Sequence, residues 1–285
     1  MKHIGLILAV SILVIMVLTA FFMLFARFMI QDSSIPVRSG LIDSSSSKTI
    51  MTFFAHPDDE IAVGGTLLDA SKAGHKVVLV CLTKGEAGPT GGMVERNQLA
   101  QVRAEELRRV AGIIGAEALE IFDFPDSKLD QVEFREIKEL AIHMIEKYQP
   151  DYLITYDSRI GLYGHKDHRV VSKAMEEIYL ERKGSHAFPV KQYFQVTLCK
   201  KQIEIAMKLS SGFQRNYPKE GPGLPVPDFA VRTTQYFPDL LNMISAHATQ
   251  HEVLGDFFPY YDKIPVWIYG RIFDREYFYQ FKENE

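Results

Sequence analysis

The sequence predicts an α/β fold, in which a Rossmann-like, mainly parallel sheet carries helices on both faces and follows one N-terminal transmembrane helix. Apolar runs of strand length alternate with helix-like segments, as in α/β proteins. The strand runs are continuously apolar, as expected of parallel strands that are buried on both faces. The chain has 285 residues, of which 47% are hydrophobic and 24% charged, which is enough for a sizeable core.

The N-terminal segment predicts a membrane anchor. Ile4 to Ala26 carries no charged residue and, at ~1.5 Å per helical residue, is long enough to cross a ~30 Å hydrocarbon core. The apolar run continues beyond Leu18-Thr19-Ala20, which favours an uncleaved anchor over a cleaved signal peptide. We expect a single-pass protein of the cell membrane with an extracytoplasmic folded domain, although Arg27, Arg38 and Lys48 oppose that orientation.

The remaining chain divides into a linker and a folded domain. Residues 1–30 are the expected anchor, residues 31–48 a flexible, serine-rich linker, and residues 49–285 the domain. The expected strands are 49–55, 76–83, 118–123, 151–156 and 192–199. The expected helices are 60–73, 94–114, 133–148, 168–181, 202–209 and 238–249. Residues 210–228 are expected to form a surface loop, and the aromatic tail 265–281 to pack back on the domain.

Charge and cysteine content exclude two classes of protein. The net charge is −4 and the lysines and arginines are scattered, so no basic surface for nucleic acid is expected. The two cysteines, Cys81 and Cys199, lie in apolar runs and are expected to be buried thiols rather than a disulfide.

Two loops carry residues that suit a metal site. Ala55-His56-Pro57-Asp58-Asp59-Glu60 follows the first strand of the domain, and Gly161 to Arg169 follows the strand 151–156. In parallel sheets both loops lie at the carboxyl edge, where ligands bind. His56, Asp59 and His168 would supply two imidazoles and one carboxylate, which is the open ligand set of a catalytic zinc. Such a zinc acidifies a bound water and polarises a carbonyl, and Asp58 could act as the general base.

These loops also allow other interpretations. A histidine and an aspartate after a strand are more often a turn, and His165 with His168 alone is more often a solvated loop. Both loops at one sheet edge favour a site. Two histidines and one carboxylate also bind non-haem iron, but such oxygenases usually have all-β barrels.

The motifs together resemble a known family. The pattern Ala-His-Pro-Asp-Asp-Glu at 55–60 and Gly-His-Lys-Asp-His-Arg at 164–169 is similar to that of the LmbE-like, or PIG-L, family of N-acetylglucosaminyl de-N-acetylases. Further similar segments are Lys84 to Gly88, Arg103 to Glu106 with Gly115-Ala116, and Ala246 to Gln250. The resemblance covers most of the chain from Thr49 to about Gln250.

This resemblance implies roles for single residues. Zinc would be held by His56, Asp59 and His168, and Asp58 would be the general base. The other implied site residues are His165, which would stabilise the oxyanion or protonate the leaving amine; Asp167, which would orient an imidazole; Tyr163, which would bind the substrate carbonyl; Arg103, which would hold sugar hydroxyls or support Asp58; and His247, which would be an acid, a substrate contact or a structural histidine. Glu60, Arg169 and Asp126 are as compatible with capping, solvated or turn roles as with a pocket edge.

The implied function is a zinc-dependent hydrolase that removes the N-acetyl group from an N-acetylglucosamine-containing conjugate, using metal-activated water and an aspartate base. The membrane anchor favours a glycolipid or envelope glycan over a small glycoside. Two alternatives stay open at this point. One is an amidohydrolase of the same fold with a non-acetyl or non-sugar substrate, and the other is a non-catalytic envelope protein that binds metal or sugar.

Overall fold

The computed structural model describes residues 2–282 and contains one central sheet of eight strands. The strands are β1 (Val37–Arg38), β2 (Thr49–Phe54), β3 (Lys76–Thr83), β4 (Ala118–Phe124), β5 (Tyr152–Thr155), β6 (Gln192–Thr197), β7 (Phe229–Arg232) and β8 (Arg275–Gln280). The α-helices are α1 (Lys2–Ile30), α2 (Gly64–Lys72), α3 (Leu99–Ile114), α4 (Phe134–Tyr148), α5 (Gly161–Gly164), α6 (Lys166–Arg182), α7 (Lys200–Leu209), α8 (Ser211–Asn216), α9 (Phe237–Ala246), α10 (His251–Phe257) and α11 (Val266–Ile272). Short 3₁₀ helices are η1 (Asp59–Val63), η2 (Arg96–Gln98), η3 (Leu129–Gln131), η4 (Thr234–Tyr236) and η5 (Ala248–Gln250).

The strand order is β1-β7-β8-β6-β5-β2-β3-β4. The chain runs outward from β2 through β3 to β4, then returns to place β5 and β6 on the other side of β2, all in parallel. The order therefore reverses between β2 and β5, and such a switch point opens a crevice at the carboxyl ends of the two strands. The mainly parallel sheet is confirmed, with β8 as an antiparallel strand between β6 and β7.

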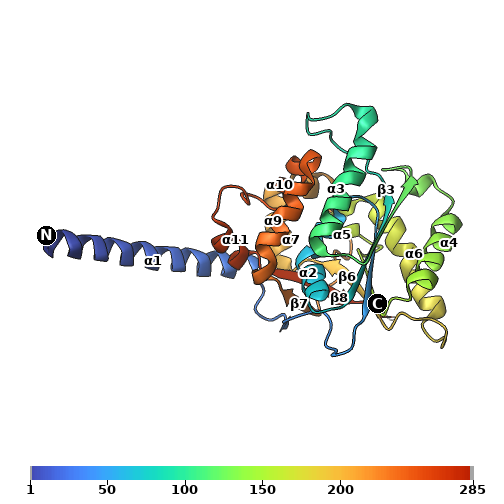
Figure 1. The fold of residues 1–285 in the computed structure, drawn as a ribbon, viewed down its shortest axis with the longest axis horizontal. Coiled ribbons are helices and arrows are strands. Elements are labelled where there is room, and N and C mark those ends of the chain that lie inside the picture. The colour runs from blue at the N-terminus through green and yellow to red at the C-terminus, as the bar shows by residue number, and fades with distance from the viewer. Residues whose placement is uncertain (1, 283–285) are drawn as a thin grey trace.

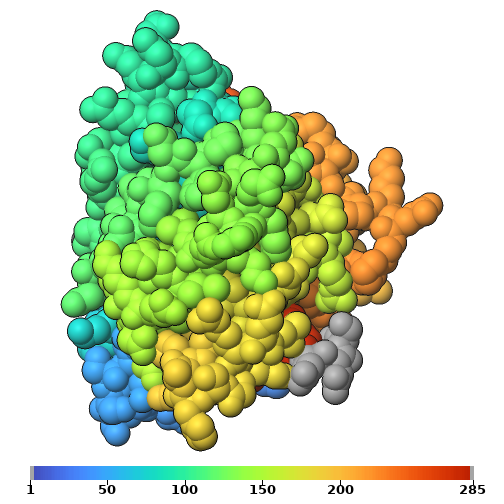
Figure 2. Space-filling model, turned by 90° about the vertical axis from the view of Figure 1, so that its right-hand side faces the viewer, coloured from blue at the N-terminus to red at the C-terminus, as the bar shows by residue number. Residues whose placement is uncertain are grey.

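Helices cover both faces of this sheet. In Figure 1, α2, α3 and α9 lie on one side of β3, and α4 and α6 lie on the other. Residues coloured green to yellow, which include α4 and α6, cover the face seen in Figure 2. Side chains of β2 alternate between the two layers, with Ile50 and Phe54 in one core and Met51 and Phe53 in the other. The two cores hold the ends of β2 and β5 in place.

The segment expected to be a flexible linker is partly ordered. Val37–Arg38 forms β1 and pairs in parallel with β7 at the edge of the sheet. Ile35 and Leu41, on either side of this strand, are buried. The polar, serine-rich composition of this segment gave no indication that Ile35 and Leu41 are buried. The strand with which β1 pairs also lies nearly two hundred residues later in the chain. The division of the chain into anchor, linker and domain stays a prediction.

The C-terminal part contains more structure than expected. Residues 210–228 do not form only a surface loop, because α8 begins after Ser210, whose hydroxyl accepts a hydrogen bond from the Phe213 amide. The Phe213 side chain is buried. The aromatic tail packs back as expected, but it does so as α11 and the antiparallel strand β8. Three consecutive side chains of β8 are buried, and Phe278 among them lies in the core.

Helix α1 projects from the domain, and its last turn is docked onto it (Figure 1). Residues His3–Ile30 are long and apolar enough to cross a membrane. At its end, an Arg27 Nη1 atom lies 3.1 Å from the Asp274 carboxylate. The Gln31 amide donates to Asp274 Oδ1 and to the Ile272 carbonyl, each at 2.8 Å. The direction of α1 is therefore fixed relative to the domain.

Glu276 on β8 gives a testable pH dependence of stability. Its carboxylate accepts hydrogen bonds from the Gly65 and Thr66 amides at 2.7 and 2.8 Å, yet burial raises its pKa to about 7. A folded-state pKa above the unfolded value means that the unfolded chain loses this proton first, so the free energy of unfolding falls between about pH 4.5 and 7. We expect Glu276→Gln to remove roughly 2–3 kcal/mol of this pH dependence. Thermal unfolding of both proteins at pH 5 and pH 8 measures it; an unchanged pH profile in the variant would contradict the prediction.

Candidate active site

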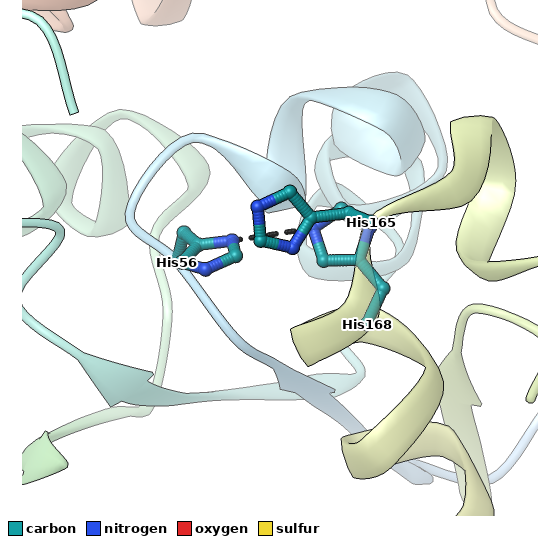
Figure 3. A group of neighbouring side chains, drawn as sticks. All are labelled: His56, His165 and His168. Atoms are coloured by element: carbon teal, nitrogen blue, oxygen red, sulfur yellow. Dashed lines mark hydrogen bonds between the residues drawn. The ribbon is translucent and has the colours of Figure 1, made fainter. Parts of the chain in front are cut away.

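Three predicted ligands meet at the switch point. The His168 Nε2 atom lies 3.0 Å from Asp59 Oδ1 and 3.2 Å from His56 Nδ1. His56 Nδ1 lies 3.5 Å from Asp59 Oδ2. Figure 3 shows the imidazole of His56, from the loop after β2, and that of His168, from the start of α6, approaching each other, with His165 beside them. Two imidazole nitrogens and one carboxylate therefore face a common point.

The local turn explains how Asp59 reaches this point. The Asp59 Oδ2 atom accepts hydrogen bonds from the amides of His56, at 2.8 Å, and Ala55, at 3.2 Å. The carboxylate thus folds back over the end of β2 and closes the loop. Tyr156, at the end of β5, donates its hydroxyl to the Asp59 carbonyl at 3.1 Å. The turn is fixed from both strands of the switch point.

The second nitrogen of each imidazole is held by an acceptor. His168 Nδ1 lies 3.1 Å from the Gly161 carbonyl. His56 Nε2 lies 3.1 Å from Asp126 Oδ1 and 3.3 Å from Asp167 Oδ2. In the neutral rings that a metal would bind, each of these nitrogens carries the proton, which leaves a lone pair on the nitrogen that faces Asp59. Metal-ligating histidines are usually oriented in this way, so the donor set fits a divalent metal.

Gly161 makes the approach of His168 possible. Its φ is +67°, and a Cβ atom there would lie 2.8 Å from the Cβ of His168. A larger side chain would push the helix α6 away from the loop. The glycine in this motif is therefore needed both for the backbone turn and for the close contact.

Two further groupings share His56. The nitrogens of His56, His165 and His168 lie within 4.8 Å of one another, as do the ligand atoms of His56, Asp126 and Asp167. In the second grouping the His56 atom is Nε2, which faces away from Asp59. We therefore interpret the carboxylates of Asp126 and Asp167 as hydrogen-bond partners of this nitrogen. In the first grouping His165 would be a metal ligand in place of Asp59. The metal content of variants can distinguish the two ligand sets.

Asp58 lies beside this cluster in a constrained position. Its φ is +110°, and its amide donates to Glu60 Oε2 at 3.0 Å. Its carboxylate lines the cavity described below. Burial raises the pKa of Asp58 to about 6, and the positive charge of Arg103 only partly opposes this rise. The carboxyl is thus tuned towards proton transfer near neutral pH.

Arg103 supports Asp58. Its Nη2 atom lies 3.0 Å from Asp58 Oδ2 and also bonds the Pro57 carbonyl, while Nη1 donates to the Gly85 carbonyl at 2.8 Å. Of the two roles expected for Arg103, these contacts favour support of the base. The guanidinium also lines the cavity, so a contact with sugar hydroxyls stays a prediction.

His247 is placed differently from a catalytic side chain. It is fully buried, and its Nε2 atom lies 2.6 Å from Glu60 Oε1. Within the described residues, the lining of the cavity does not include His247. Glu60 in turn accepts the Asp58 amide, so His247 holds the turn of Asp58 from behind. The sequence motif could not reveal this because the pairing joins positions far apart in the chain.

The remaining predicted residues surround the imidazoles. His165 caps α6, since its Nδ1 atom accepts the Asp167 amide at 3.3 Å. Burial, and then the neighbouring His168 and His56, lower the pKa of His165 to about 3, so its ring is neutral at pH 7. Asp167 is fully buried and accepts the Leu129 amide at 3.2 Å. Tyr163 lies edge-on to His168, with ring centroids 5.4 Å apart.

Two site residues were not predicted firmly from sequence. Asp126, which was left between a turn and a site role, contacts His56 and accepts the Ala87 amide at 2.8 Å. Tyr156 stacks on His168 with ring centroids 4.4 Å apart. Both residues follow a strand at the carboxyl edge of the sheet, and this position was the indication that the sequence offered.

Asp126 supports a prediction on metal affinity. Asp126→Asn should weaken zinc binding by about 10- to 100-fold, because His56 loses the charge that orients it and raises its basicity. Titration against a chromophoric chelator measures this. Asp123→Asn, at an exposed carboxylate of the preceding strand β4, is the matched control, and equal zinc affinities in the two variants would contradict the role.

The cluster opens into a cavity of about 350 Å³. Its lining includes His56, Asp58, Asp59 and His165. A volume of this size suits a small ligand or a sugar unit. Metal ligands, base and ligand space thus lie together.

Comparison with known proteins agrees with the motifs. Residues 51–179 match the family model described as PIG-L, GlcNAc-PI de-N-acetylase. The PIG-L family model therefore matches the part of the chain that holds both motifs. A PIG-L relative named diacetylchitobiose deacetylase, from Thermococcus kodakarensis, is 35% identical over 43% of this chain, and the match spans only 45% of that relative. A 1D-myo-inositol 2-acetamido-2-deoxy-alpha-D-glucopyranoside deacetylase from Rhodococcus erythropolis is 28% identical and covers 73% of this chain and 82% of its own.

A solved structure shares the PIG-L fold. The N,N'-diacetylchitobiose deacetylase from Pyrococcus horikoshii superimposes with a TM-score of 0.58. The alignment covers 83% of this chain and 84% of that chain, at 21% sequence identity. The similarity confirms a mixed α/β architecture with a central sheet.

Proposed function

We propose that this protein is a metal-dependent hydrolase that removes the N-acetyl group from an N-acetylglucosamine-containing conjugate. The observation that carries the proposal is the convergence of His56, Asp59 and His168 next to the buried carboxylate of Asp58, which lines a cavity. The names of the PIG-L relatives, which are deacetylases of such sugars, support the choice of amide.

The chain's own residues supply the following chemistry. A zinc ion held by His56, Asp59 and His168 would polarise the acetamide carbonyl and acidify a water. Asp58 takes the proton from the attacking water and returns it to the sugar nitrogen as the C–N bond breaks, which releases acetate and the free amine. Arg103 holds Asp58 in place through the 3.0 Å contact. The carboxylate partners of His56 hold its imidazole in a fixed orientation, and the Gly161 carbonyl does the same for His168.

His165 is suited to the oxyanion. Its Nδ1 atom accepts the Asp167 amide, so the proton of the neutral ring sits on Nε2. This N–H can donate to the negative oxygen that develops during attack. Tyr163, which also lines the cavity, is the second candidate donor. Asp167 acts only through the orientation of His56.

The proposal includes membrane attachment through α1. The helix is long, apolar and exposed along its length, and its end is docked by Arg27 and Gln31. We place the catalytic domain outside the cytoplasm. A C-terminal epitope tag should then bind antibody on intact cells; binding only after permeabilisation would reverse the orientation.

The test of activity is mass spectrometry of a substrate panel. N-acetylglucosamine conjugates should lose their acetyl group, and a chelator should stop the loss. The panel includes N-formyl and N-propionyl analogues and a simple acetanilide. Preference for another amide would favour the amidohydrolase alternative, whereas no hydrolysis of any amide would favour a binding protein.

A further inference from the structure

The end of α1 is flanked by helices of the folded domain. Both α11 and α7 contact α1, and Figure 1 shows α11 at the edge of the domain from which α1 projects. On α1, Met23, Ala26 and Ile30 are partly buried, whereas residues 3–18 are exposed. These three residues are spaced to lie on one face of the helix. The domain therefore reaches back along α1 by about two turns, or ~10 Å, into its apolar run.

Helix α11 has one buried face and one exposed apolar face. Tyr269 is buried, whereas the side chains of Val266 and Trp267 are 39% and 54% exposed. A Cβ atom on Gly270 would lie 2.7 Å from the Phe237 Cβ, so α11 is packed closely against α9. This packing fixes the inner face of α11 and leaves its outer face pointing away from the core.

The outer face of α11 has the side chains that are typical of a membrane interface. Tryptophan and tyrosine are enriched at the level of the lipid headgroups, and long cationic side chains extend from there towards water. The helix contains no acidic residue, and its one charged residue is Arg271, which donates to the Trp267 carbonyl at 2.7 Å. In the segment that leads to α11, Tyr260 and Lys263 are exposed, with the Lys263 ammonium 5.7 Å from the ring centroid. Asp262 is the one acidic residue between Tyr260 and α11.

The contact between α11 and α1 lies where the uncharged run ends. Arg27 is the first charged residue after the run Ile4 to Ala26, and its guanidinium bonds the Arg271 carbonyl. In a helix that crosses a bilayer, such a residue lies at the level of the headgroups. Helix α11 has seven residues and is therefore ~10 Å long. Trp267 thus lies within about the depth of the headgroup layer, ~5–8 Å on each side of a bilayer, from this contact.

We propose that the outer face of α11 lies in the headgroup layer of the bilayer that α1 crosses, with the Trp267 ring at the boundary of the hydrocarbon. Burial of Val266 and Trp267 there removes apolar surface from water. The inference rests on the proposed attachment through α1 and goes beyond it, because it gives the domain a second membrane contact. Two contacts hold the domain in one orientation against the bilayer, whereas a single helix end would let it tilt.

The test uses the intrinsic fluorescence of the full-length protein in lipid nanodiscs. Trp267 is the only tryptophan of the chain, so the emission reports this position alone. Lipids brominated near the headgroup end of their acyl chains should quench most of the emission, and lipids brominated near the chain ends should quench less. The control is Trp267→Phe combined with Leu180→Trp, which moves the tryptophan to an exposed position of α6, away from α1 (Figure 1). Its emission should be quenched by acrylamide in the water and by neither lipid.

The alternatives give different quenching patterns. If acrylamide quenches Trp267 as fully as the control and the brominated lipids do not, α11 faces water and the inference is overturned. Emission protected from both quenchers also overturns it, because protein, such as a second copy of the chain, would then cover α11. Extraction with alkaline carbonate tests α1 separately. Protein that leaves the bilayer overturns the anchor together with this inference, whereas protein that stays with Trp267 unquenched by lipid overturns this inference alone. Acetate release is measured independently and tests the deacetylase function.

Discussion

Asp58→Asn is expected to lower kcat/KM for deacetylation by about 100- to 10,000-fold while the metal stays bound. Asparagine has nearly the same shape and tolerates the positive φ of this position. Its oxygen can still accept from Arg103, so the turn should persist. The amide cannot take a proton from water, so only the base is lost.

The measurements are steady-state kinetics and metal content of the same preparation. Asp123→Asn, an exposed aspartate of β4, controls for the change in charge. Retained metal with near wild-type activity in Asp58→Asn would contradict the assignment of the base. Lost metal would instead show that Asp58 is needed for the ligand geometry.

His168→Ala is expected to abolish stoichiometric metal binding and, with it, activity. The side chain is 1% exposed, and its Nε2 atom faces both Asp59 and His56. Removal leaves one imidazole and one carboxylate, too few ligands for a tight zinc site. Elemental analysis after dialysis measures the loss.

His165→Ala is the matched comparison. It removes an imidazole from the same loop, but we expect it to retain about one metal ion per chain and to lose activity through the missing oxyanion donor. If both His165→Ala and His168→Ala lose the metal, the three-histidine grouping is the correct ligand set. Circular dichroism of both variants checks that α6 remains folded.

The amino-acid sequence alone was sufficient to predict the site residues that directly follow the parallel strands. The run Thr49 to Phe54 is largely apolar, and the polar residues of the motif follow directly after it. The strand, its end and the position of His56 could therefore all be predicted. The same holds for Tyr152 to Thr155 and the loop with His168. Local pattern and the rule for carboxyl edges were sufficient here.

The rest depended on contacts between distant segments. The antiparallel insertion of β8 between β6 and β7 follows from packing and not from the pattern of Arg275 to Gln280 itself. The pairing of His247 with Glu60 also joins segments with no shared signal. The Pro- and Gly-rich composition of residues 210–228 predicted a loop. Part of this segment instead forms α8, whose Phe213 side chain is buried in the domain.

The most direct test of the account is metal reconstitution followed by acetate release. Chelator-treated protein should be inactive on an N-acetylglucosamine glycoside and regain activity in proportion to added zinc, with a plateau at about one ion per chain, as expected for one open catalytic site. Full acetate release by protein that contains no metal would contradict the central claim.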